Sequence, residues 1–234
     1  MENTYSLRSE YKYLTTNNDL ELIEEKLSRI LELDSHTNSI NKNYIIHSLY
    51  FDDMNNTCMK DNDAGLGKRF KYRIRYYNDN LENLFLEKKE KINGLGHKIV
   101  CKISKEDYDN LINGNEMDVF WNTQNNILKK FCIDINTRFF KPKIIIDYER
   151  TAYVEPITNV RVTFDRNISC SKGIDNFLDR EYIKYPLLNT DRHILEVKFD
   201  SVLPSYIIGA VEATKACQTS FSKYYLSRMT YERN

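Results

Sequence analysis

The stretch Phe70-Lys71-Tyr72-Arg73-Ile74-Arg75-Tyr76-Tyr77 decides how the rest of the chain is interpreted. Successive side chains of a β-strand point to opposite faces. A strand here therefore places three cations, Lys71, Arg73 and Arg75, on one face and aromatic and aliphatic side chains on the other. An ordinary antiparallel sheet turns such a charged face to water, so the other strands must decide between a solvated face and a functional one.

Most of the other expected strands repeat this alternation of charged and apolar residues. These strands are expected at residues 8–14, 44–52, 83–91, 97–103, 141–154, 160–166 and 193–200. On their charged faces the cations far outnumber Glu10, Glu87 and Glu196, although the chain contains 34 Lys+Arg and 34 Asp+Glu and has no net charge. The sequence thus concentrates its cations on strands.

A barrel with these charged faces turned inward would enclose a basic, water-filled tunnel, with helices covering its apolar outer face. Clustered like charges repel by roughly 1 kcal/mol or more per close pair, so such a tunnel needs a polyanion. Lysine and arginine suit phosphate oxygens, and the few carboxylates would serve a divalent metal bound to the same phosphates. From the residues alone, a phosphate-binding lumen and a sheet with a charged exterior remain as alternatives.

Helices are expected between and after the strands. Thr16 to Asp19 can cap a helix that carries apolar residues as far as Leu31. Ser104 and Asp107 form a capping-box pattern for a short helix. Further helices are expected at residues 125–132 and, as one or two segments, at 204–228, and a polar loop up to Gly67 is expected after the strand at 44–52.

Composition excludes several classes of function. Zero net charge gives no general attraction for nucleic acid, and the scattered cysteines and histidines lack the spacing of a zinc site. The residues 1–4 show no signal-peptide pattern, and no apolar run reaches the roughly 20 residues of a membrane span. We expect one domain over residues 1–234, a cytoplasmic location and reduced thiols; the sequence does not predict an oligomeric state.

The motifs on these strands resemble those of the VTC domain, the polyphosphate polymerase branch of the triphosphate tunnel metalloenzymes. The matching motifs, in chain order, are Arg8-x-Glu10-x-Lys12-Tyr13, Ser48-Leu49-Tyr50-Phe51-Asp52, Lys71-x-Arg73-x-Arg75-Tyr76, Leu86-Glu87-x-Lys89, Asp147-Tyr148-x-Arg150-x-Ala152-Tyr153, Arg161-x-Thr163-x-Asp165, Leu195-Glu196-Val197-Lys198 and Phe221-Ser222-Lys223-Tyr224. Each motif is weak alone, but their order over residues 8–224 makes the resemblance specific.

The resemblance implies an α+β fold with an antiparallel eight-stranded β-barrel tunnel and flanking helices. It also implies transfer of the γ-phosphate of ATP to a growing inorganic polyphosphate chain, with Mn²⁺ or Mg²⁺. The residues expected to hold the phosphates in catalysis are Lys12, Arg73, Arg75, Lys89, Lys98, Arg150 and Arg161. Substrate-binding roles are expected for Tyr148, Ser222 and Lys223, and Lys91 and Lys198 join them from the charged faces. Glu196 falls at the metal ligand, with Glu10 as its helper.

Two positions depart from the patterns of related proteins. Ser220 stands where relatives can carry a further lysine. The first strand reads Arg8-x-Glu10-x-Lys12, whereas the hydrolytic and cyclase branches have ExExK, so one metal-binding carboxylate is missing. This difference favours a polymerase; a tunnel triphosphatase and a non-catalytic polyphosphate-binding module are the alternatives.

Overall fold

The computed structural model describes residues 8–35, 37 and 42–232. Residues 1–4, on which the expected lack of a signal peptide rests, lie outside the described residues. In the part of the chain that is described, no helix combines the length and apolarity needed to cross a bilayer.

Eleven strands, all paired antiparallel, form one sheet within the described residues. They are β1 (Ser9–Thr16), β2 (Glu32–Leu33), β3 (Tyr44–Asp52), β4 (Lys68–Tyr77), β5 (Asn80–Ile92), β6 (Leu95–Ile103), β7 (Lys141–Glu155), β8 (Val160–Ser171), β9 (Tyr185–Pro186), β10 (Arg192–Phe199) and β11 (Cys217–Gln218). The long strands match the runs of alternating charged and apolar residues, which confirms the predicted α+β class with a large antiparallel sheet.

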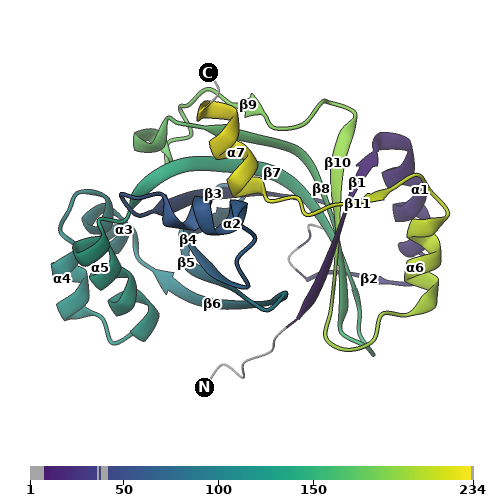
Figure 1. Cartoon of the computed structure of the whole chain (residues 1–234), viewed down its shortest axis with the longest axis horizontal. Coiled ribbons are helices and arrows are strands. Elements are labelled where there is room, and N and C mark those ends of the chain that lie inside the picture. The colour runs from purple at the N-terminus through teal and green to yellow at the C-terminus, as the bar shows by residue number, and fades with distance from the viewer. Residues whose placement is uncertain (1–7, 36, 38–41, 233–234) are drawn as a thin grey trace.

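The helices that accompany the sheet are α1 (Asn17–Leu27), α2 (Thr57–Asp63), α3 (Lys105–Ile112), α4 (Glu116–Asn122), α5 (Asn126–Arg138), α6 (Ser205–Glu212) and α7 (Lys223–Glu232), with one short 3₁₀ helix, η1 (Ile174–Asn176). Figure 1 shows the sheet bent into a deep curve, with α3, α4 and α5 at one end, α1 and α6 at the other, and α2 and α7 beside the bend.

The curved sheet is not a closed barrel. Its strand order is β11-β1-β10-β8-β7-β3-β4-β5-β6, and the two ends meet at one isolated bridge, where Arg8 and Gly96 exchange backbone hydrogen bonds of 3.1 and 3.0 Å. At the other end of the same edge of β1, Tyr13 and Leu14 pair with β11 instead. Because β11 occupies that part of the edge, β6 cannot pair along it, and the predicted eight-stranded barrel is not confirmed.

The apolar outer face of the sheet lies beneath helices, as predicted. On the β1–β10–β8 side, outward residues such as Val162, Phe164 and Val197 pack with Ile23 and Ile207 from α1 and α6. A larger core lies beneath α3, α4 and α5. In contrast, α2 and α7 pack over part of the inner face, where the Tyr224 ring stacks on Tyr50 with centroids 5.2 Å apart. The rest of the inner, charged face is left to line cavities.

Local sequence signals explain several element ends. Asn93 and Gly94 have φ angles of 48° and 88° and form the two-residue turn between β5 and β6, where Ile92 pairs with Leu95. The capping box of α3 is confirmed: the Asp107 N–H donates to Ser104 Oγ at 2.9 Å, and the Ser104 N–H donates to Asp107 Oδ2 at 3.0 Å. Thr16 caps α1.

Other elements differ from the prediction. The segment after Asp53 contains the helix α2 in place of the expected polar loop, α4 was not predicted, α1 ends before Leu31, and α5 runs past residue 132 to Arg138. The signal for α2 is the acidic pair before it, because Asp52 accepts the N–H groups of Cys58 and Met59 and Asp53 accepts that of Thr57. These bonds satisfy the exposed donors of a helix start.

Asp52 also joins α2 to α7, and its replacement tests that junction. The buried carboxylate accepts from Cys58 N–H and Met59 N–H at 2.9 and 3.1 Å and from the Tyr224 hydroxyl at 2.6 Å. In Asp52→Asn the side-chain NH₂ group would face donors that now bond to the carboxylate, and at least one buried donor would lose its acceptor. We therefore expect the free energy of unfolding to fall by about 1–3 kcal/mol. Urea denaturation measures this; Asp109→Asn, at an exposed site on α3, is the control, and equal midpoints for D52N and wild type would contradict the assignment.

Candidate functional site

Two adjoining cavities lie on the inner face of the sheet. The first has a volume of about 200 Å³ and the second about 340 Å³. Six residues line both cavities: Glu10, Arg73, Lys89, Gly96, Arg150 and Lys198. The shared wall makes them two parts of one basic space, which we call the lumen.

The lumen contains every site residue predicted from the sequence. Those that line the first cavity are Glu10, Lys12, Arg73, Lys89, Lys91, Tyr148, Arg150, Glu196, Lys198, Ser222 and Lys223. Those that line only the second are Arg75, Lys98 and Arg161. Ser220 also borders the first cavity. The structure thus brings together residues from β1, β4, β5, β6, β7, β8, β10 and α7, although it does not test their chemical roles.

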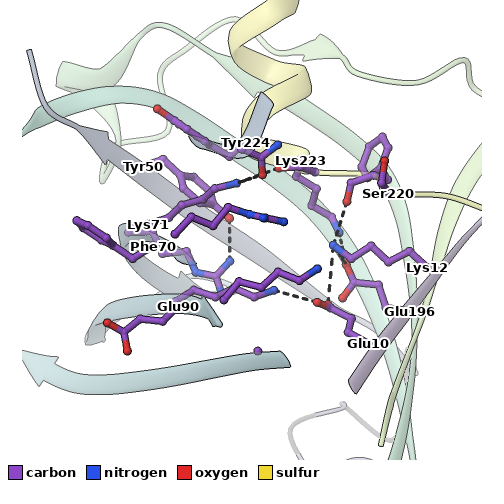
Figure 2. Close-up of a pocket in the computed structure, with 18 of the residues that line it drawn as sticks. Glu10, Lys12, Tyr50, Phe70, Lys71, Glu90, Glu196, Ser220, Lys223 and Tyr224 are labelled. Atoms are coloured by element: carbon purple, nitrogen blue, oxygen red, sulfur yellow. Dashed lines mark hydrogen bonds and ion pairs between the residues drawn. The ribbon is translucent and has the colours of Figure 1, made fainter. Parts of the chain in front are cut away.

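Glu196 and Asp165 form a buried acidic pair beside four cations. Lys223 Nζ contacts Asp165 Oδ2 at 2.5 Å and Glu196 Oε1 at 3.0 Å, and the Arg150 guanidinium donates to both Asp165 oxygens at 2.6 and 2.7 Å. Burial opposes ionisation of Glu196, but the charges of Lys223, Lys198 and Lys12 outweigh it and hold the pKa of that carboxyl well below its usual range. Figure 2 shows Lys223 and Lys12 pointing toward Glu196.

Glu10 lies on the neighbouring strand β1 and shares cations with Glu196. Lys12 Nζ is 3.8 Å from Glu10 and 3.7 Å from Glu196, and Lys198 Nζ is 3.6 and 3.2 Å from the same two carboxylates. Burial raises the pKa of Glu10, but Lys89, Lys12 and Lys198 outweigh it and lower that pKa to about 2. Both carboxylates are therefore charged at neutral pH.

A third acidic centre, Glu87, holds the cations of β4 and β6. Arg73 contacts Glu87 Oε2 at 2.5 Å, Lys98 Nζ contacts Oε1 at 3.2 Å, and Arg75 lies at 3.8 Å. Burial opposes the charge on Glu87, but Arg73, Arg75 and Lys98 outweigh it and keep its pKa well below the usual range. The strand alternation placed Glu87 on the correct face, but sequence reasoning gave it no site role.

Tyrosine hydroxyls fix the orientation of the arginines. Arg73 donates to the Tyr50 hydroxyl at 2.8 Å, and Arg75 donates to the Tyr148 hydroxyl at 3.0 Å. The ammonium of Lys223 lies 4.8 Å from the centre of the Tyr148 ring. The lumen is therefore organised before any ligand binds.

Sequence reasoning assigned no site role to several lining residues. They include Arg8, Tyr50, Asn62, Arg69, Lys71 and Tyr224. The strand alternation had already placed Lys71 on the charged face with Arg73, and Arg69, two residues before Lys71 on β4, points to the same face. Asn62 and Tyr224 come from α2 and α7, where no strand alternation marks the inward face. Phe70 and Glu90 also border the first cavity, but Figure 2 shows their side chains pointing away from Glu10 and Glu196.

The carboxylates fit a divalent cation only if a ligand completes its coordination. Among the described residues no group of three or more Asp, Glu, His or Cys side chains could hold a metal. Glu10 and Glu196 share two lysines, and Glu10 Oε1 is buried without a hydrogen bond. One or two carboxylates together with phosphate oxygens are the usual ligands of Mg²⁺, so these residues fit a metal carried on phosphates.

The fold and site define an α+β protein with a cation-lined lumen on the inner face of a curved antiparallel sheet. The chain belongs to the VTC domain family, whose sequence pattern matches residues 7–231. No curated protein sequence matches the chain.

Three solved structures that match this chain have low sequence identity to it. One is the PH1819 protein from Pyrococcus horikoshii OT3, with 14% identity over 96% of each chain and a TM-score of 0.46. Another is a protein from Bacillus halodurans described only provisionally as an adenylate cyclase, with 10% identity over 88% of each chain and a TM-score of 0.49. The PH1012 protein from P. horikoshii OT3 has 12% identity over 88% of this chain and 86% of that one, with a TM-score of 0.43.

Replacing Asp165 tests whether buried charge pairing holds the lumen together. Asp165→Asn removes the charge opposite Arg150 and Lys223, so we expect the free energy of unfolding to fall by about 3–5 kcal/mol. Glu25→Gln is the control, because its partner Arg29 and Glu25 are both exposed and such pairs contribute about 1 kcal/mol or less. Denaturant titration compares them; equal losses in the two variants would show that Asp165 is not a structural charge.

Proposed function

We propose that this protein is a polyphosphate polymerase that transfers the γ-phosphate of ATP to a growing inorganic polyphosphate chain, with residues 1–234 forming one VTC-type tunnel domain. The observation that carries the proposal is the continuity of the lumen, whose two cavities share Arg73, Lys89, Arg150 and Lys198 and together are lined by 13 Lys and Arg residues against three glutamates. A linear chain of phosphates matches that continuous charge better than a single small anion does. Membership of the VTC domain family supports the same reading.

The chain's own residues would bind the phosphates and neutralise charge. Arg73, Arg75 and Arg150 are held by tyrosine and carboxylate partners, so their guanidinium groups would meet phosphate oxygens with little reorganisation. Lys89 is less constrained, since its ammonium is 3.4 Å from Glu10 and its side chain is 40% exposed. Positioning and charge neutralisation are the main requirements of phosphoryl transfer.

The transfer itself needs no catalytic base. An oxygen of the terminal phosphate of the acceptor chain, already anionic, attacks the γ-phosphorus of ATP. The bond from that phosphorus to the β–γ bridging oxygen breaks, and ADP leaves with the electron pair. Arg150 and Lys223 would stabilise the charge that develops on the transferred group.

Glu196, assisted by Glu10, would hold Mn²⁺ or Mg²⁺ against the phosphates. When bound, the metal would contribute charge neutralisation across phosphate oxygens. For Glu196 to bind it, Lys12, Lys198 and Lys223 must turn from the carboxylate to the phosphates. The same rearrangement would couple substrate binding to metal binding.

Arg8 favours polymerisation over hydrolysis. In the hydrolytic and cyclase branches, the matching position of the ExExK motif carries a carboxylate. Here the Arg8 side chain borders the second cavity and its Nε lies 2.8 Å from Asp200 Oδ1. A cation at this position weakens the case for a second metal and for an activated water.

The direct test is incubation of the purified protein with ATP and Mn²⁺, with ADP release and the phosphorus products followed together by gel and ³¹P NMR. We expect a ladder of long polyphosphate in proportion to ADP. Glu196→Gln should remove both products and serves as a control for contaminating enzymes. Orthophosphate as the main product would assign a triphosphatase instead, and tight tripolyphosphate binding without turnover would assign a binding module.

Replacement of lumen cations should separate activity from folding. Lys89→Ala and Arg75→Ala should each reduce turnover at least a hundredfold, about 3 kcal/mol of transition-state stabilisation, because each removes a positive charge from the phosphate path. Circular dichroism and the melting temperature check that the fold persists. Lys68→Ala, an exposed lysine on β4 outside both cavities, is the matched control, and wild-type turnover in either lumen variant would reject the assignment.

A further inference from the structure

Lys71 lies at the junction of β4, α2 and α7 and borders the first cavity. Its ammonium donates to Asn62 Oδ1 at 2.8 Å and to Ser222 Oγ at 3.0 Å, and it lies 5.1 Å from the centre of the Tyr224 ring. All three partners are neutral. An ammonium has three donors, so one remains for a ligand in the cavity.

The absence of a carboxylate distinguishes Lys71 from four other lysines that line the first cavity. Lys12, Lys89, Lys198 and Lys223 each lie within 4.0 Å of a glutamate or aspartate. Within the described ranges, Lys71 forms no such ion pair. It therefore has no fixed counter-charge in the ligand-free protein.

The groups that face Lys71 are mostly cationic. They are Lys89 directly across on β5, Lys12 on β1, Arg69 on its own strand and the Cys58 thiol on α2. Burial and the neighbouring Asp52 raise the pKa of that thiol, so Cys58 supplies no negative charge. The Tyr224 ring favours the ammonium form only weakly.

Burial and like charges both favour the neutral amine at such a position. Burial, followed by Lys89 and Lys12, lowers the pKa of Lys71 to about 7. Lys71 in the empty lumen is therefore mostly uncharged at pH 8, and an anion placed beside it would supply the missing counter-charge and raise that pKa.

We propose that Lys71, Asn62 and Ser222 form a phosphate-binding subsite in which binding of a phosphate group is accompanied by uptake of one proton by Lys71. The neutral amine accepts a proton from solvent and becomes an ammonium paired with the phosphate oxygen, so charge and atoms balance. The inference rests on the proposed function only in requiring that the lumen binds phosphates.

The sign of the pH dependence follows from this linkage. Below pH 7, Lys71 is charged with or without ligand, and it adds no pH dependence to binding. Above pH 7, the free protein must take up a proton, so phosphate affinity falls by up to tenfold per pH unit until the higher pKa of the bound state is reached. The subsite would thus bind phosphates most tightly in neutral or mildly acidic conditions.

Isothermal titration calorimetry with tripolyphosphate at pH 8, in buffers of different ionisation enthalpy, counts the protons exchanged. Lys71→Arg keeps the positive charge but cannot titrate at this pH. We expect wild type to take up close to one proton more than K71R on binding. Protons exchanged by the ligand and by Lys198, whose pKa is about 8, are the same for both proteins and cancel in the difference. K68R, on the exposed part of the same strand, should match wild type.

Equal proton numbers for wild type and K71R would overturn the proposal. Should K71R fail to fold, Lys71→Met, which cannot titrate either, takes its place, with sulfate as the ligand because sulfate has no group that titrates near neutral pH. Equal proton numbers for K71M and wild type at pH 8 would overturn the proposal as well. The same experiments distinguish failure of the two proposals. Proton-coupled binding without polymer synthesis would reject the polymerase and support the Lys71 subsite. Absence of any tripolyphosphate binding would reject the polymerase and the subsite together.

Discussion

The rest of the structure depends on the neutralisation of cations that are taken out of water. Glu196, Asp165 and Glu87 are buried in or beside the lumen wall, and each contacts at least two Lys or Arg side chains. Unpaired, such clustered charge would oppose folding by several kcal/mol. The acidic residues make the cationic lumen compatible with a folded chain, and they leave an excess of positive charge along its wall.

This arrangement depends equally on the outer face of the sheet. Each strand has one face for the lumen and one for an apolar core, so the same alternation that collects Arg161 and Asp165 inside collects Val162 and Phe164 outside. Helices such as α1, α5 and α6 cover the outer face, whereas α7 lies over the inner one and supplies Lys223 to it. Folding energy and ligand-binding charge thus come from opposite sides of one sheet.

The alternation of strand side chains between two faces explains how much of the fold and of the candidate site could be predicted from the sequence. Because parity alone assigns a strand residue to a face, residues such as Arg75, Arg150 and Lys198 were placed in the lumen correctly. Parity says nothing about which edges meet, so the incomplete pairing of β1 with β6 was not predictable. It also says nothing about helices that pack over the inner face, so Asn62 and Tyr224, which α2 and α7 bring to Lys71, were not predicted.

The bridge between Arg8 and Gly96 has a topological consequence. A wall that is hydrogen-bonded all round is a ring, and a long polymer can enter or leave a ring only by an end. Here the two ends of the sheet are joined by only two backbone hydrogen bonds, which form a seam between Arg8 and Gly96. Breaking these two bonds costs about 1–3 kcal/mol. If the lumen binds a polymer as proposed, parting this seam would let the polymer enter from the side, so threading would not limit the length of the bound polymer.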